Sequence, residues 1–281
     1  MKKQKLGFSV GKRYDAPLRD VVKLLAEVGF YAVSPVWSAD RCHEEAIRAA
    51  RELGLELQSL HAPFGGAAAM WSNDEARWAP ALEEQLLALE DCRRYEIPVM
   101  VAHTWIGFGD EVGDIAAGLS HFEVLVRRAE KYGVRVALEN TEGLSYLEEL
   151  LEHFHGNGTV GFCWDSGHEA CYNGGNDLLS RFGDRLYMTH LNDNLGVSDP
   201  NGNIYWTDDL HLLPGDGSLD WENAVSRLRG ARPLEILNFE LKRDSIPGRH
   251  ENDAYGRMTL EDYFTEAYRR ACRIGEGYFQ D

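Results

Sequence analysis

Residues 160–168 read VGFCWDSGH, an apolar run that ends in an aspartate and a histidine. The run Val160–Trp164 is typical of a buried strand, because a short continuous apolar segment suits a strand that is covered on both faces. Asp165 and His168 follow at once, three residues apart. The sequence Asp-Ser-Gly is typical of a turn, but an aspartate and a histidine at this position could also form half of a metal site. The ends of the other strands bear on this choice.

Apolar runs alternate with amphipathic stretches along the whole sequence, and Gly29, Gly54 and Gly133 each end a helical stretch just before the next run. Eight strands alternating with helices predict an α/β fold, a (β/α)8 TIM barrel that spans residues 1–281 as a single domain. The alternative is a doubly wound open sheet, but no GxGxxG follows the first strand. The predicted strands are Lys5–Val10, Tyr31–Trp37, Leu55–His61, Val99–His103, Val134–Glu139, Val160–Trp164, Leu186–His190 and Leu234–Leu241.

The composition limits the classes of function. The chain has 281 residues, of which 44% are hydrophobic, so it can bury one large core. It contains no apolar run long enough to cross a bilayer and no signal-peptide pattern at its start, so we expect a cytoplasmic protein without a membrane partner. The five cysteines are scattered and favour reduced thiols. A formal net charge of −17 argues against a nucleic-acid partner.

Histidines and carboxylates stand at the carboxyl ends of the last six predicted strands. In a barrel enzyme these ends converge on the face where the chemistry takes place. Each residue alone could be a cap, a turn or an ion-pair partner. Together they would leave charges poorly compensated in one barrel mouth, so we predict a bound divalent cation. The residues are His61, His103, Glu139, Asp165, His168, His190 and Glu240, with Asp209 and His211 in the connection after the seventh strand.

The residue types indicate what the cation is. Mixed carboxylate and imidazole ligands suit Mn²⁺ or Zn²⁺, with Co²⁺, Mg²⁺ and Fe²⁺ as alternatives. No cysteine joins the set, which argues against a closed structural zinc site. Open coordination positions could bind oxygens of a polyol and polarise a carbonyl group.

The other five histidines are expected on the surface, and five aromatic residues are expected near the barrel mouth. We expect these histidines on solvated helices and loops: His43, His121, His153, His155 and His250. We expect aromatic side chains near the barrel mouth to wall a compact pocket around sugar carbons, with loop packing as the alternative. The aromatic residues are Trp37, Phe64, Trp71, Trp105 and Trp206.

Six short motifs occur in order on successive strands: HAPF, LEN, DSGH, HLNDN, DLHLLPGDGSLDW and FEL. With these motifs the chain resembles the xylose-isomerase-like TIM barrel superfamily over nearly its whole length. This superfamily includes sugar and sugar-phosphate isomerases and epimerases, and it is related to the endonuclease IV family of abasic-site nucleases. Each motif alone is weak, but their order is specific.

For the isomerase and epimerase branch, the resemblance implies one metal ion with the ligands Glu139, Asp165, His190 and Glu240. Glu139 and Glu240 would also be the catalytic acid and base, and His168 would contact a substrate oxygen. The implied reaction moves a proton next to the carbonyl of a small carbohydrate, through an enediolate on the metal. We expect this function, in a protein that could form a homo-oligomer.

Two other functions remain open at the level of sequence. The nuclease branch implies three zinc ions, and all nine candidate ligands have counterparts there. The residue patterns of the HAPF and HLLPGDGSLDW motifs resemble those of the sugar enzymes, and the negative net charge of the chain also favours the sugar enzyme. A non-catalytic, metal-stabilised sugar-binding barrel is the third reading, and the presence of both Glu139 and Glu240 argues against it. Lys12-Arg13 and Lys242-Arg243 could hold a substrate phosphate, but we interpret them as solvated surface charge.

Overall fold

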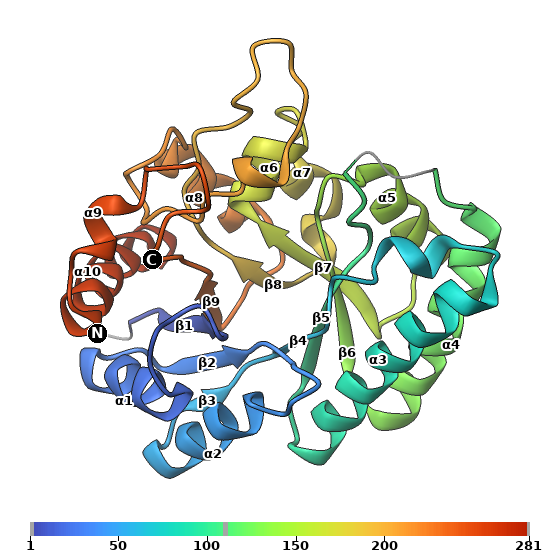
Figure 1. The fold of residues 1–281 in the computed structure, drawn as a ribbon, viewed down its shortest axis with the longest axis horizontal. Helices are drawn as coiled ribbons and strands as arrows, with labels where there is room; N and C mark the ends of the chain where they lie inside the picture. The colour runs from blue at the N-terminus through green and yellow to red at the C-terminus, as the bar shows by residue number, and fades with distance from the viewer. Residues whose placement is uncertain (1–2, 109–111, 280–281) are drawn as a thin grey trace.

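The computed structural model of the chain describes residues 3–108 and 112–279. The strands lie around a central axis and the helices lie outside them, which confirms the predicted TIM barrel (Figure 1). The strands are β1 (Lys5–Val10), β2 (Ala32–Pro35), β3 (Glu56–Leu57), β4 (Leu60–His61), β5 (Val99–His103), β6 (Arg135–Glu139), β7 (Val160–Asp165), β8 (Leu186–His190) and β9 (Ile236–Phe239).

Helices follow most of the strands. None of those in the described part of the chain combines the length and the apolar character needed to cross a membrane. Gly29, Gly54 and Gly133 end their helices in the left-handed region, as predicted. The α-helices are α1 (Leu18–Val28), α2 (His43–Leu53), α3 (Glu75–Arg94), α4 (Ile115–Tyr132), α5 (Leu144–His153), α6 (Ser166–Tyr172), α7 (Leu178–Phe182), α8 (Trp221–Gly230), α9 (Asp253–Gly256) and α10 (Leu260–Tyr278).

The ring of strands consists of two parallel sheets, in the orders β3-β2-β1-β9 and β4-β5-β6-β7-β8. Two isolated parallel bridges join them, Val36 with His61 and Leu191 with Phe239. The prediction of one strand over Leu55–His61 was wrong, because this segment pairs with β2 through β3 and with β5 through β4. The ladder is interrupted between the two, where the sheet must curve to close the ring.

The inner faces of β5 to β8 place the candidate ligands above an apolar floor. Val101, Ala137, Cys163 and Met188 form a small buried cluster inside the barrel together with Val99. Side chains two positions apart lie on the same face of a strand. The next inward positions along the four strands are therefore His103, Glu139, Asp165 and His190.

The long connection after β8 is fixed at its base by the fully buried carboxylate of Asp193. This carboxylate accepts four hydrogen bonds, two at each oxygen, so its acceptor capacity is filled. The donors are Asn194 N at 2.9 Å, Gly215 N at 2.7 Å, Leu219 N at 3.1 Å and Trp221 Nε1 at 2.9 Å. An antiparallel bridge between Asp193 and Leu212 ties the middle of the connection to the same point.

We expect Asp193→Asn to lower the free energy of unfolding by about 2–3 kcal/mol, because the amide would turn an N–H group toward backbone donors. Urea-induced unfolding of the chelator-treated chain would measure this change. The exposed Asp184 provides the control Asp184→Asn, for which we expect less than about 0.5 kcal/mol. Equal stability of the two variants would contradict the anchoring role of Asp193.

Candidate metal centre

The structure gathers candidate ligands into groups at the carboxyl ends of the strands. In one group, His61, Glu139, His190 and Glu240 are all buried, and one ligand atom from each lies within 4.8 Å of the others. A second group combines His168, Asp209 and His211 within the same limit. Asp165 lies close to members of both groups. It forms a third group with Glu139 and His168, and a fourth with His211 and Glu240.

The carboxylate of Glu139 lies at the centre of these groups and has no exposed surface. Imidazole nitrogens surround it, with His103 Nε2 at 3.2 Å, His61 Nε2 at 3.3 Å, His190 Nδ1 at 3.0 Å and His168 Nδ1 at 3.4 Å. Within the described residues, neither carboxylate oxygen of Glu139 and neither ring nitrogen of His190 has a well-aligned hydrogen bond. Buried polar atoms of this kind need a partner, and a divalent cation fits both the oxygen and the nitrogen donors.

Glu240 and Asp165 are held by neighbours that leave ligand atoms facing the same centre. Glu240 Oε2 lies 2.9 Å from His190 Nδ1, and its Oε1 accepts a hydrogen bond from Arg13 Nη2 at 2.6 Å. Both oxygens of Asp165 accept from Asn192 Nδ2, at 3.1 Å and 3.0 Å. Asp165 also caps α6 by accepting from His168 N at 2.7 Å, so the turn chemistry and the ligand position belong to the same residue.

Asn192 contacts the candidate ligand Asp165 but was not among the predicted site residues. Its side chain orients Asp165, and a side chain at Gly167 would collide with it, because a Cβ there would lie 1.9 Å from Asn192 Oδ1. The DSGH and HLNDN motifs are thus coupled through one contact. The signal in the sequence was an asparagine two positions after His190, at the end of the next strand.

In the second group, backbone hydrogen bonds set the orientation of both imidazoles. His168 Nδ1 donates to Asn140 O at 2.9 Å, and His211 Nδ1 donates to Glu240 O at 2.9 Å. Each Nε2 therefore faces Asp209, at 3.6 Å from its Oδ1 for His168 and 2.7 Å from its Oδ2 for His211. This arrangement is common for metal-binding histidines. His211 also has a φ of 49°, a backbone conformation that costs free energy in a residue with a side chain.

The charges of the cluster shift its pKa values. Burial lowers the pKa of His190, but Cys163, Glu139 and Glu240 outweigh this effect and hold it well above its ordinary value. Burial raises the pKa of Glu139 and Glu240, but His190 and the other cations nearby hold both well below the ordinary value. Burial also raises the pKa of Asp165. Protonated imidazoles thus balance the carboxylates, and a metal ion would have to displace these protons.

The two groups border a cavity of about 320 Å³ at the mouth of the barrel. Its apolar wall includes Phe64 and Trp206, as expected, and also Ile106, Phe108 and Tyr172. The other three aromatic residues do not line it, because their indoles are engaged within the barrel wall. Trp37 donates to Asp91 Oδ2 at 3.0 Å, Trp71 donates to Thr104 O at 2.7 Å, and Trp105 stacks on Tyr146 at 4.2 Å.

Two of the histidines expected on the solvated surface are buried. His43 has no exposed surface and its Nε2 lies 3.1 Å from Asp91 Oδ2. His121 Nδ1 donates to Met70 O at 2.8 Å, and its ring stacks on Trp78. The prediction was wrong for these two because both lie on the inner faces of their helices.

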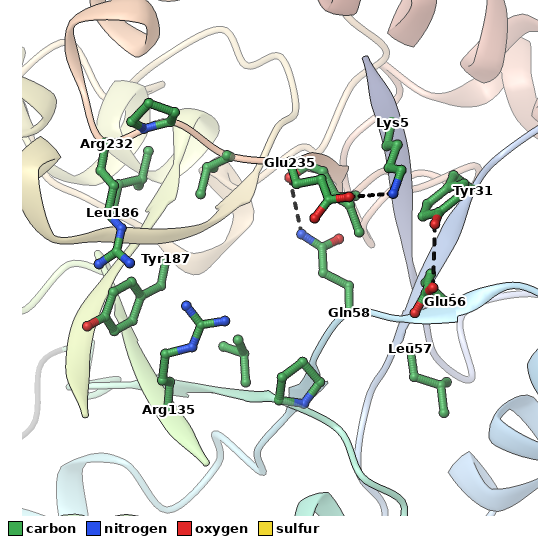
Figure 2. Close-up of a pocket in the computed structure, with 15 residues that line it drawn as sticks. Lys5, Tyr31, Glu56, Leu57, Gln58, Arg135, Leu186, Tyr187, Arg232 and Glu235 are labelled. Carbon is green, nitrogen blue, oxygen red and sulfur yellow. Dashed lines mark hydrogen bonds and ion pairs between the residues drawn. The ribbon is translucent and has the colours of Figure 1, made fainter. Parts of the chain in front are cut away.

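A separate cavity of about 400 Å³ lies at the opposite end of the barrel, where the strands begin. Figure 2 shows Arg135 and Arg232 on either side of the Tyr187 ring, at 5.0 Å and 4.7 Å from its centroid. None of the candidate ligands borders this cavity.

The sequence profile of the xylose isomerase-like TIM barrel family matches residues 22–262. The chain belongs to this family. The uncharacterized protein y4fM of Sinorhizobium fredii is 28% identical to this chain, over 94% of this chain and 90% of its own length.

Solved structures share the fold of this family member at low sequence identity. IolI, determined with a bound zinc atom, is 18% identical, with a TM-score of 0.75 over 98% of this chain and 99% of its own. The 3-keto-D-glucoside 4-epimerase YcjR of E. coli is 18% identical, with a TM-score of 0.66 over 90% and 98%. The D-psicose 3-epimerase of Clostridium cellulolyticum, determined with D-tagatose, is 14% identical, with a TM-score of 0.67 over 98% of both chains.

We expect the affinity for Zn²⁺ or Mn²⁺ to fall as the pH is lowered from about 8 to about 6. The raised pKa of His190 keeps a proton on a nitrogen that the ion needs, so the loss begins above the ordinary pKa of about 6.5. Calorimetric titration of the chelator-treated chain, in two buffers of different ionisation enthalpy, would measure both the affinity and the protons released. A pH-independent affinity with no proton release would contradict this assignment.

Proposed function

We propose that this protein is a divalent-metal-dependent isomerase or epimerase that acts on a small carbohydrate or a related hydroxy-carbonyl compound. One observation carries the proposal: Glu139 and Glu240 approach the same nitrogen, His190 Nδ1, at 3.0 Å and 2.9 Å. Two carboxylates from different strands thus meet in one metal-ligand group. The sugar epimerases among the structural neighbours support the same reading.

The proposed ligands are Glu139, Asp165, His190 and Glu240. Glu139, His190 and Glu240 form one group with His61, whereas Asp165 is grouped with Glu139 and His168, and with Glu240 and His211. When bound, a divalent ion would polarise the substrate carbonyl and acidify the neighbouring carbon. The orphaned atoms of Glu139 and His190 support this ligand set.

The two glutamates would transfer the proton. Both have a pKa well below the ordinary value, so each is ionised at neutral pH. One carboxylate would take the proton from the carbon next to the carbonyl and later release it to solvent. The other would take up a proton from solvent and deliver it to the substrate. Return to the opposite face of the same carbon inverts that centre, and return to the neighbouring carbon interconverts an aldose and a ketose.

The cavity suits a small substrate. Its volume of about 320 Å³ lies at the lower end of the range for small-molecule sites. The apolar wall, in which Phe64 packs against His61 and Tyr172 stacks on His168, would cover the substrate carbons and exclude water from the reacting centre. The net charge of −17 provides no basic footprint for a nucleic acid.

A second candidate function rests on the group of His168, Asp209 and His211. Together with His61 and His103 around Glu139, this group offers ligands for more than one ion. Several ions at this mouth would suit hydrolysis of a phosphoester, as in an endonuclease IV-like nuclease. The number of bound ions separates the two candidates.

We expect Glu139→Gln and Glu240→Gln each to lower kcat by at least about 100-fold, because each change removes a proton-transfer group. Turnover of a ketose panel in D₂O, with deuterium incorporation at the reacting carbon, would measure both proton transfer and product. Metal content must be measured alongside, since both residues are proposed ligands. The exposed Glu83 provides the control Glu83→Gln, and near-normal turnover in either of the other variants would refute the assignment.

The metal content of protein purified without chelator distinguishes the two functions. We expect one divalent ion per chain, lost in the His190→Ala variant and retained in His61→Ala and His103→Ala. Elemental analysis by mass spectrometry would count the ions. Two or three zinc ions, reduced in number by His61→Ala or His103→Ala, would favour the hydrolytic candidate, and cleavage of an abasic-site duplex would then be the next assay.

A further inference from the structure

Each of the two basic dipeptides has one residue that borders the mouth cavity and one that does not. Arg13 and Lys242 line this cavity, with 23% and 27% of their side-chain surface exposed. Lys12 instead pairs with Asp40 on the surface, and Arg243 pairs with Asp244 outside the lining. The interpretation of Arg13 and Lys242 as solvated surface charge was therefore wrong.

Both cations touch a candidate ligand carboxylate and retain unused donors. Arg13 gives one hydrogen bond, from Nη2 to Glu240, and its buried Nη1 has no hydrogen-bond partner in the described residues. Among residues 3–108 and 112–279, Lys242 Nζ hydrogen-bonds Asp209 alone, with its carbonyl oxygen at 3.3 Å and Oδ2 at 3.2 Å. A guanidinium has five N–H donors and an ammonium has three, so most of this donor capacity remains available.

The two residues also lie together in the fold. Arg13 follows β1 and Lys242 follows β9, and these two strands pair with each other. Phe64 and Phe108, which belong to the apolar wall, follow β4 and β5 in the other sheet. One side of the cavity is therefore cationic and the other is apolar.

We propose that Arg13 and Lys242 bind an oxyanion group of the substrate, either a carboxylate or a phosphate. Resting on the proposed function, this inference makes the substrate a sugar acid or a sugar phosphate rather than a neutral sugar. An oxyanion offers several acceptors at once, and the planar guanidinium matches its geometry. Binding of the metal ion by Glu240 would weaken its hold on Arg13 and leave more of this guanidinium available to the substrate.

Binding of inorganic phosphate and of acetate to the metal-loaded chain tests this assignment without turnover. We expect Lys242→Met and Arg13→Gln each to raise the Kd of the preferred anion by about 10- to 100-fold, as for loss of a charge-assisted hydrogen bond. The control Lys12→Met removes one positive charge outside the cavity and should leave the Kd within about twofold of wild type. The tighter of the two anions identifies the group as phosphate or carboxylate.

Metal content must be measured in each variant, because Arg13 contacts Glu240. Arg13→Lys retains the charge and should recover part of the affinity. If Lys242→Met and Arg13→Gln bind both anions as tightly as wild type at equal metal content, the anion rests on the metal ion alone and the assignment is overturned.

Kinetics with a ketose, its terminal phosphate ester and the corresponding sugar acid extend the test. We expect Lys242→Met to raise KM for the anionic substrate by at least about 10-fold, with a smaller effect on kcat and on the neutral ketose. If the anionic substrates are isomerised no better than the neutral ketose, and Lys242→Met leaves KM for the anionic substrates unchanged, the oxyanion site is overturned and the isomerase proposal stays intact. Variant-sensitive phosphate binding without any isomerase activity would support the site and overturn the proposed function.

Discussion

A carboxylate that water cannot reach determines how the mouth of this barrel is built. Glu139 has no exposed surface and no well-aligned hydrogen bond in the described residues. An isolated charge in such a place costs several kcal/mol, so its neighbours must supply positive charge. The imidazoles of His190, at the end of β8, and His168, in α6, meet this need, because nearby carboxylates hold the pKa of both well above the ordinary value despite their burial.

Side chains repeat on the same face of a strand every two residues, and this repeat places the charged residues around Glu139 directly above the apolar core. Val101, Ala137, Cys163 and Met188 form the floor, and the ligand-bearing positions come two residues later on the same inner faces. A slip of one residue in any strand would turn its polar end away from the centre and its apolar residue out of the floor. Packing of the core and placement of the site are thus one constraint.

The sequence predicted the barrel and the nine polar residues at its mouth because both follow from local pattern. Apolar runs, C-cap glycines and polar strand ends can each be read within a few residues. What it could not predict depends on partners distant in sequence. The division of Leu55–His61 into β3 and β4 depends on β2 and β5, and the burial of His43 depends on Asp91. Which aromatic residues face the cavity, and which member of each basic dipeptide does so, is likewise settled by tertiary packing.

Asp193 anchors the base of the connection after β8 but not its tip. The base and the tip can therefore change independently of each other. The base of the connection is held by backbone donors from both of its ends, Asn194 at the start and Gly215 and Leu219 at the finish, and the connection carries Asp209 and His211. The tip, residues 199–203, is largely exposed and projects from the barrel (Figure 1), and it is followed by Trp206 on the cavity wall. Residues exchanged or inserted at the tip would leave the hydrogen bonds to Asp193 in place. Under the proposed function, the cavity wall beside Trp206 could therefore diverge among relatives while the polar groups at the barrel mouth stay fixed.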